Sequence, residues 1–234
     1  MPTSSAPARP ARVVWLDGTD PDALGRARRR DVVVSPKADW LRAAFVRSVR
    51  DRPARRIPRV LVTASLRARE RAAYETASDV VVDKSVARML PTRELRDALE
   101  ADNRADLMVA ASYAPGADVV TLYRGTLAAL VVPADWFRSV GDDTRTTPDL
   151  SALVPTDYGQ TLRLGDAEVS ADAVLYEFDA EARRRMDARL RRGDMSARRR
   201  EEQETALGEL SDQAQELGLY DMDPRMPGTE GPSS

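Results

Sequence analysis

The chain has 234 residues and contains neither histidine nor cysteine. Without imidazole or thiolate it has no Ser-His-Asp or Cys-His catalysis, no thiol redox chemistry and no Cys/His zinc site. The formal net charge of −2 gives no overall field that would favour nucleic acid or an acidic membrane. No apolar run approaches the length of about 18 residues that spans a membrane. We expect a cytoplasmic protein without cofactor, metal or membrane partner.

The first part of the chain, residues 11–102, alternates short apolar runs with helical patterns. The runs are apolar throughout, which is typical of parallel strands covered on both faces. They lie at residues 13–16, 32–34, 60–62 and 80–82. Strand–helix alternation at this pitch predicts right-handed crossovers and a parallel sheet.

Two helices are clear within this part. The first, over residues 38–51, has one apolar stripe at helical spacing. Its members are Trp40, Leu41, Ala44, Phe45, Ser48 and Val49. The second follows Thr92 as its expected N-cap, and Leu95, Ala98 and Leu99 are predicted to form its buried face.

From residue 105 the pattern becomes strand-rich. Strands are predicted at 107–111, 119–123 and 127–132, with Arg124-Gly125 as the tight turn between the last two. A short helix at 133–140 follows, with Trp136 and Phe137 as expected core anchors. A hairpin turns at Gly165-Asp166, between 161–164 and 167–169, and residues 173–178 fit either a strand or a helical turn.

These patterns predict an α/β fold: a small parallel sheet with flanking helices, a small α+β domain at 105–178 and C-terminal helices. Residues 179–223 are expected to form a charged helical tail. Residues 1–10 and 224–234 are rich in Pro, Gly and Ser, and are therefore predicted to be disordered.

The first part resembles a truncated response-regulator receiver domain. The run 57–64 ends in Thr63-Ala64, like the fourth strand of that family, and the run 80–82 is followed by Asp83-Lys84, like the fifth strand and its lysine. On this alignment the first strand and its acidic pair are missing, and Ser35 stands where the acceptor Asp would be. The resemblance implies a phosphorylation-incompetent, receiver-like domain whose remnant site is Ser35, Thr63 and Lys84. An unrelated flavodoxin-like layout is the alternative.

Residues 105–178 resemble the small family known as domain of unknown function 2442. The resemblance rests on a strand, a hairpin, a short helix with a bulky apolar pair, a Thr-Pro-x-x-Leu step and a closing hairpin. In this chain they are residues 109–113, 121–131, 133–137, 147–150 and 159–175. The resemblance implies an adaptor role beside transcription regulators. An unassigned α+β domain is the alternative.

The C-terminal region divides into a basic and an acidic segment. Residues 201–223 carry eight acids and no base, and Leu207, Leu210 and Leu217 repeat there as a candidate dimer seam, which at two heptads is short for a coiled coil. Arginines of the segment 183–200 could bind phosphate, because clustered cations release counter-ions. The candidates are Arg183, Arg184, Arg185, Arg191, Arg192, Arg198, Arg199 and Arg200.

Three functions are weighed. The first is a non-catalytic regulatory or adaptor protein that acts through protein–protein contacts, as a homodimer through the leucine seam. The second is a nucleic-acid-associated transcriptional regulator that uses the segment 183–200. The third is a metal-dependent enzyme that uses Asp17 with Asp31 or Asp83, because α/β sheets bind ligands at the carboxyl ends of their strands.

Overall fold

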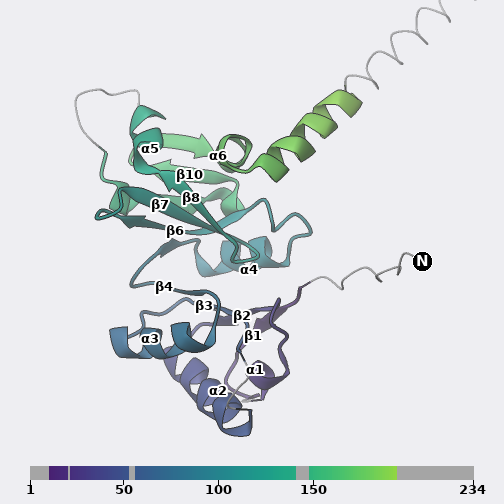
Figure 1. Ribbon diagram of the computed structural model, residues 1–234, viewed down its shortest axis with the longest axis vertical. Coiled ribbons are helices and arrows are strands. Elements are labelled where there is room, and N and C mark those ends of the chain that lie inside the picture. Colours follow the sequence, from purple (N-terminus) through teal and green to yellow (C-terminus); the bar gives the residue numbers. More distant parts are fainter. Residues whose placement is uncertain (1–10, 21, 53–55, 141–147, 194–234) are drawn as a thin grey trace, which may run out of the picture. The chain divides into compact units, whose positions relative to one another are not determined.

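The computed structural model describes residues 11–20, 22–52, 56–140 and 148–193 (Figure 1). Residues 1–183 form one compact unit and residues 184–234 a second, and each is described by itself. The termini predicted to be disordered, 1–10 and 224–234, lie outside the described residues. Among the described helices none is long and apolar enough to cross a bilayer.

A four-stranded parallel sheet forms the first layer, as predicted. Its strands are β1 (Val13–Trp15), β2 (Val32–Ser35), β3 (Arg59–Val62) and β4 (Val81–Asp83), in the order β1-β2-β3-β4. Each strand pairs with the next one along the chain, so right-handed crossovers place the connecting helices on one face. These helices are α1 (Ala23–Arg26), α2 (Ala38–Asp51) and α3 (Ala68–Ala77).

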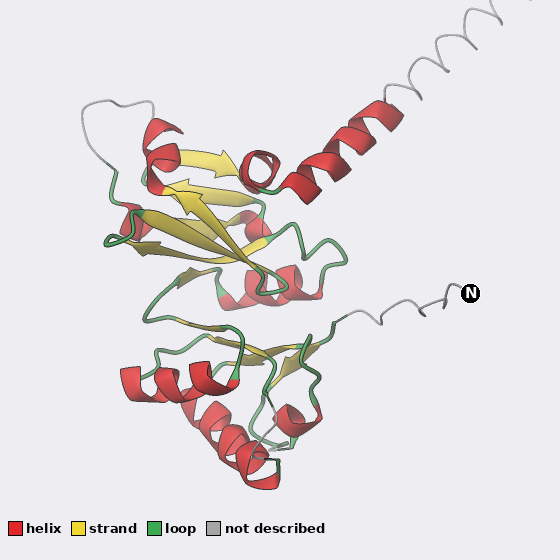
Figure 2. Ribbon diagram, viewed as in Figure 1, coloured by secondary structure: helices red, strands yellow, loops and turns green. Residues whose placement is uncertain are grey.

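The helical face of the sheet has its own core. Val33, Val60 and Val62 point toward it and pack with Leu41 of α2 and Tyr74 of α3. Figure 2 shows the three red helices gathered on one side of this sheet. The layer therefore buries alternate residues of each strand against the helices and leaves the other residues for the opposite face.

Helix α2 has the predicted bounds, and its buried residues are Leu41, Ala44 and Ser48. The outer part of the predicted stripe lies nearer to solvent, since Val49 is 37% exposed. At the start of the helix the Trp40 indole covers Gly18, whose φ of +84° suits glycine; a Cβ there would lie 2.6 Å from Trp40 Nε1.

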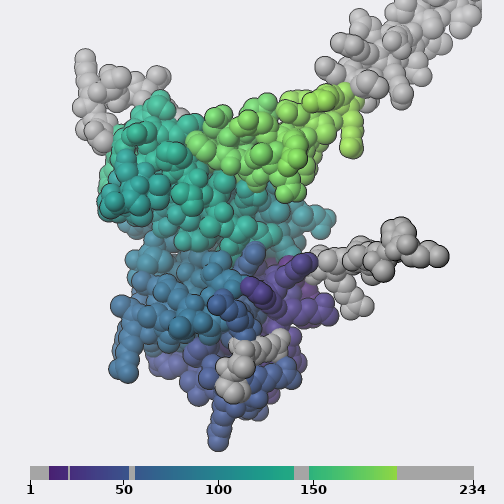
Figure 3. Space-filling model, viewed as in Figure 1, coloured from purple at the N-terminus to yellow at the C-terminus, as the bar shows by residue number. Residues whose placement is uncertain are grey.

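The opposite face is covered by α4 (Thr92–Glu100) and an antiparallel sheet. That sheet has the order β5-β6-β7-β8 and consists of β5 (Arg88–Met89), β6 (Met108–Ala114), β7 (Val119–Arg124) and β8 (Ala129–Pro133). Val34 and Leu61 of the parallel sheet share one core with Leu95 and Leu99 of α4 and Val109 of β6. The blue and teal atoms of these segments meet without a gap in Figure 3. The two predicted segments of the first unit are therefore packed through a common apolar layer.

Two details of this region differ from the sequence prediction. Thr92 is the first residue of α4 rather than its N-cap; Pro91 takes that place and no side-chain cap hydrogen bond forms. A strand was expected from residue 127, but Leu127 has a φ of +54°, belongs to the turn and is followed by β8 from Ala129. The buried face of α4 was predicted correctly.

The remaining elements complete the first unit. They are α5 (Ala134–Val140), η1 (Leu150–Ala152), β9 (Val154–Thr156), η2 (Asp157–Gly159), β10 (Thr161–Leu164), β11 (Ala167–Ser170) and α6 (Ala171–Phe178). Strands β9 to β11 form a second antiparallel sheet, and β10–β11 is the predicted hairpin. Residues 173–178, which fitted either a strand or a helical turn, belong to helix α6. Phe137 is fully buried, whereas Trp136 is half-buried and meets Phe178 edge to face.

The turn after β7 approaches the backbone closely. Gly125 N donates to Arg104 O at 3.0 Å and to Leu107 O at 2.9 Å. A Cβ at this position would lie 2.7 Å from Arg104 O and 2.8 Å from Arg104 Cβ. Because the crowding atoms belong largely to the backbone, the turn accepts only glycine without movement.

Gly125→Ala should therefore lower the free energy of unfolding by about 1–3 kcal/mol through overpacking. Gly116→Ala is the matched control, because nothing lies within 4 Å of its Cβ position. It should leave stability unchanged or raise it by about 0.4–1 kcal/mol. Urea unfolding of both variants measures the difference, and equal midpoints would contradict the role given to Gly125.

Candidate functional site at the carboxyl edge of the parallel sheet

The carboxyl edge of the parallel sheet is where α/β folds usually bind ligands. Ser35 pairs in register with Val62, and Val62 with Asp83, so these residues end their strands in one row. Thr63 N donates to Ser35 O at 3.0 Å. Lys84 follows Asp83 directly. The structure thus brings the three predicted remnant residues, Ser35, Thr63 and Lys84, to one edge.

These three residues differ in their surroundings. Ser35 is fully buried, and its hydroxyl donates to Lys37 O at 2.7 Å at the entry to α2. Thr63 is half-buried and Lys84 is exposed. The Ser35 hydroxyl therefore closes the turn that leads into α2.

Asp83 is the buried acid of this edge, with a side chain fully removed from solvent. Its Oδ1 accepts from Leu66 N at 3.2 Å, from Ser85 N at 2.8 Å and from Ser85 Oγ at 2.5 Å. Its Oδ2 accepts from Arg71 Nε at 2.6 Å. Burial raises the pKa of Asp83, but the Arg71 guanidinium and the Ser85 and Leu66 donors outweigh it, so the pKa lies below its usual value.

The Asp83 carboxylate joins three segments: the end of β4, the loop after β3 and helix α3. Sequence reasoning named this residue only as a candidate metal ligand. The available signal was an acid directly after an apolar strand, with Ser85 two residues later in Asx-turn spacing. Arg71 was not predictable as the partner, because the pairing depends on how α3 packs.

The other acids weighed as catalytic lie elsewhere. Asp31 was expected at a carboxyl end but precedes β2, so it lies at the amino edge of the sheet. It is buried and accepts from Arg12 N at 2.9 Å and Arg28 N at 2.8 Å; these bonds outweigh burial and lower its pKa. Asp17 is exposed, and its hydrogen bonds with Thr19 lower its pKa. Within the described ranges, no three Asp, Glu, His or Cys residues gather as a metal-binding group.

The predicted Arg-rich segment is described only in part. The guanidinium of Arg183 donates to Tyr176 O and Glu177 O, each at 2.6 Å, and lies 5.4 Å from the Tyr176 ring centroid. It therefore binds the carbonyl end of α6. The four positions Arg184, Arg185, Arg191 and Arg192 lie in the helical residues 180–193. Six further predicted positions lie outside the described residues: Arg198, Arg199, Arg200, Leu207, Leu210 and Leu217.

Asp179 is a half-buried acid with a structural role that the sequence did not reveal. Its Oδ1 accepts from Glu181 N at 2.8 Å and Ala182 N at 3.1 Å, so it caps the start of the next helix. Its Oδ2 pairs with Arg124 at the end of β7. Burial raises the pKa, yet the Arg124 hydrogen bond and the two backbone donors lower it to about 2.

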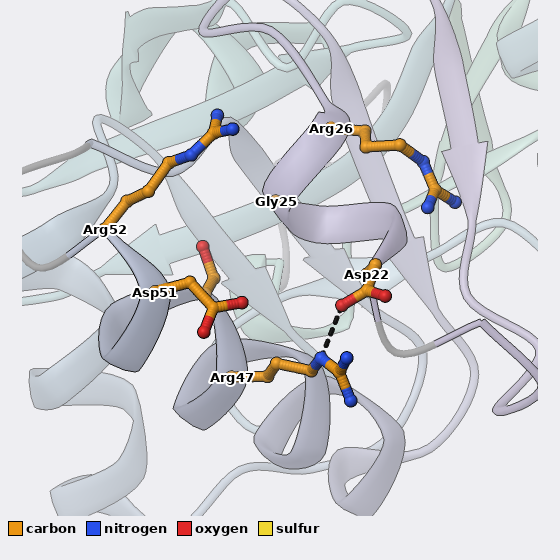
Figure 4. Close-up of a pocket in the computed structure, with 7 residues that line it drawn as sticks. Asp22, Gly25, Arg26, Arg47, Asp51 and Arg52 are labelled. Carbon is orange, nitrogen blue, oxygen red and sulfur yellow. Dashed lines mark ion pairs between the residues drawn. The ribbon is translucent and has the colours of Figure 1, made fainter.

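A cavity of about 240 Å³ lies between α1 and the end of α2 (Figure 4). Three arginines and two aspartates line it; Arg47 Nε contacts Asp22 Oδ1 at 2.5 Å, and Arg26 pairs with Asp20. The pairing leaves no strongly charged recess, so this cavity carries no ligand assignment.

Asp83→Asn should lower the free energy of unfolding at pH 7 by about 2–4 kcal/mol, because Arg71 loses its charged partner in a buried position. Asp97→Asn, at an exposed residue of α4, is the control and should change stability by less than about 0.5 kcal/mol. Chemical denaturation measures both. Equal stability of the two variants would contradict the structural role of Asp83.

The same variant predicts a pH dependence. The folded pKa of Asp83 lies below the unfolded value of about 3.9, so its contribution is present above that value and is lost as the pH falls through the folded pKa. The stability deficit of Asp83→Asn should therefore shrink on acidification below about pH 4. A deficit that is constant from neutral to acid pH would count against this assignment.

Comparisons with known proteins do not assign the chain to a family. No family model matches the chain, and neither does any curated protein or solved structure. In the flavodoxin-like strand order 2-1-3-4-5, the first strand lies between the second and the third. On the receiver alignment given above, β1 and β2 of this chain correspond to that second and third strand. Here β1 and β2 pair directly, with Val13 opposite Val32.

Proposed function

We propose that this chain is a non-catalytic regulatory or adaptor protein that acts through contacts with other proteins. Its first layer would be a receiver-like sheet that does not take part in phosphoryl transfer. One observation carries the proposal: the buried acid of the carboxyl edge, Asp83, has both oxygens engaged by Arg71, Ser85 and the backbone of Leu66.

Phosphoryl acceptance or metal binding needs carboxylate oxygens that are free to bond. At this edge, Asp83 holds two loops and a helix together, and Ser35 donates its proton to the backbone carbonyl of Lys37. Both groups would have to abandon buried hydrogen bonds before reacting, at a cost of about 1–3 kcal/mol each. The edge is therefore better suited to stabilise the fold than to perform chemistry.

Helix α2 offers apolar surface to a partner. Val46 is 60% exposed and Val49 37% exposed, and their spacing of three places them on one side of the helix. Scattered exposed valines are common, but this pair adjoins the half-buried Phe45. The combination supports a contact role for the outer side of α2.

The test of this function is incubation of the full chain with a small phosphodonor and Mg²⁺. We expect no phosphoryl adduct by intact mass, with an active receiver domain as the positive control. A chain that gains one phosphoryl group, and loses this gain on Asp83→Asn or Ser35→Ala, would contradict a non-catalytic role.

Nucleic-acid binding is the rival outcome, and it has a separate measurement. Because Arg183 is already bonded to carbonyls of α6, we expect no binding of duplex DNA at moderate salt by fluorescence anisotropy. Binding that weakens steeply with salt and disappears when Arg184, Arg185, Arg191 and Arg192 become Gln would favour the nucleic-acid function instead.

A further inference from the structure

Strand β1 ends the parallel sheet with an open edge. Arg12 O and Leu16 N bond to β2 at 2.9 and 2.8 Å, which fixes the side that faces the sheet. Because backbone groups alternate along a strand, the N–H and C=O of Val14 also face β2, whereas those of Val13 and Trp15 point outward. Within the described part of the chain, no residue hydrogen-bonds to the outward groups of Val13 and Trp15, although Arg104 Nη2 donates to the neighbouring Ala11 O.

The open edge is apolar and accessible. Val13, Val14 and Trp15 are each only half-buried, whereas all four residues of β2 are fully buried. The purple segment that contains β1 lies on the visible surface in Figure 3. A groove of about 470 Å³ adjoins the strand, and its other lining residues include Ala23, Ala27 and the ion pair of Asp20 with Arg26.

Edge strands of stable monomers are usually protected by charge, proline or a bulge. Strand β1 is short, with three residues, but it contains no charge or proline and its register with β2 is regular. Unpaired backbone groups beside apolar side chains favour the addition of another strand. The length of the strand and the charges at its two ends indicate which strand fits.

We propose that the outer edge of β1 is a self-association surface, where β1 of a second copy pairs antiparallel about a two-fold axis through Val14. In that register Val13 of one copy lies opposite Trp15 of the other. Each such pair exchanges both N–H···O bonds, so every outward backbone group of the strand gains a partner. The two four-stranded sheets become one continuous sheet.

The charges that flank the strand support the antiparallel copy. Arg12 precedes β1 and Asp17 follows it, and both line the groove. Arg12 is 61% exposed although its guanidinium lies 3.4 Å from Asp31 Oδ2, and Asp17 is also exposed. Antiparallel pairing brings Arg12 of each copy to the end that carries Asp17 of the other, whereas a parallel copy would place like charges together. A symmetric dimer therefore satisfies both ends at once.

Contacts between the Trp15 side chain and α4 hold β1 in place, so that its outer edge is ordered before it pairs. The Trp15 indole donates to Glu100 Oε1 at 3.2 Å, and Arg96 lies 4.4 Å from the Trp15 ring centroid. Both partners belong to α4, so the side chain of Trp15 is fixed while its backbone stays open. The proposal concerns a different surface from the leucine repeat and does not depend on the proposed function.

Sedimentation equilibrium of the full chain, across micromolar to submillimolar concentrations, tests the proposal. We expect a wild-type dimer that weakens by ~10-fold or more in Val13→Pro, because proline removes an outward N–H and adds bulk at the edge. The matched control is Val131→Pro. Val131 lies on the edge strand β8, is 57% exposed and has its N–H directed outward, since the bonded pair Arg124–Ala128 sets the alternation.

A wild-type dimer that is lost in Val13→Pro and kept in Val131→Pro supports the proposal. A wild-type chain that stays monomeric overturns it, and so does a Val13→Pro chain that dimerises as well as the wild type. If Val13→Pro dimerises as well as the wild type, the dimer contact lies elsewhere, for example at Leu207, Leu210 and Leu217. Circular dichroism checks that each variant is folded.

Two further measurements decide the matter if Val13→Pro does not fold. Asp17→Asn keeps an acceptor for Thr19 N and Oγ, at 2.9 and 2.7 Å in the wild type, and removes only the charge. It should weaken the dimer several-fold at low salt and reduce its salt dependence. Amide hydrogen exchange at Val13 and Trp15 should slow as the concentration rises. Exchange that is independent of concentration overturns the proposal.

Discussion

The consecutive order of the parallel strands is the constraint on which this fold depends. Since every crossover is right-handed and every strand moves in the same direction across the sheet, α1, α2 and α3 must share one face. The strands are apolar on both sides, so the second face needs an equally apolar cover. Helix α4 and β6 supply that cover, which explains why the two halves of the first unit share a core.

The local elements were largely predictable because their signals are local. Helix α2, the buried face of α4 and the β10–β11 hairpin follow from spacing and turn residues alone. The Thr92 prediction failed because Thr92 is already the first helical residue, while Pro91, whose ring fixes φ, takes the N-cap position and has no hydroxyl to donate or accept. The strand at 127 failed because Leu127 adopts a positive φ inside the turn, which no apolar pattern indicates.

The site was less predictable, since its contacts join distant segments. The resemblance to a receiver domain implied a remnant site of Ser35, Thr63 and Lys84, and the structure places these residues at one edge because strand ends of a parallel sheet meet there. The sequence could not pair Asp83 with Arg71, because that pairing depends on how α3 packs on the sheet. The amino-edge position of Asp31, in contrast, follows from its place directly before the predicted run 32–34. Receiver identity and the regulatory function therefore remain proposals that rest on the chemistry of these residues.

The three tryptophans occupy three distinct environments. Trp15 lies under an arginine of α4, Trp40 covers the backbone of Gly18 with Lys37 Nζ 4.6 Å from its ring centroid, and Trp136 meets two phenylalanines edge to face. Each indole therefore belongs to a different layer: the inner sheet face, the helical face and the antiparallel half. Tryptophan fluorescence can therefore report the order in which the three layers unfold.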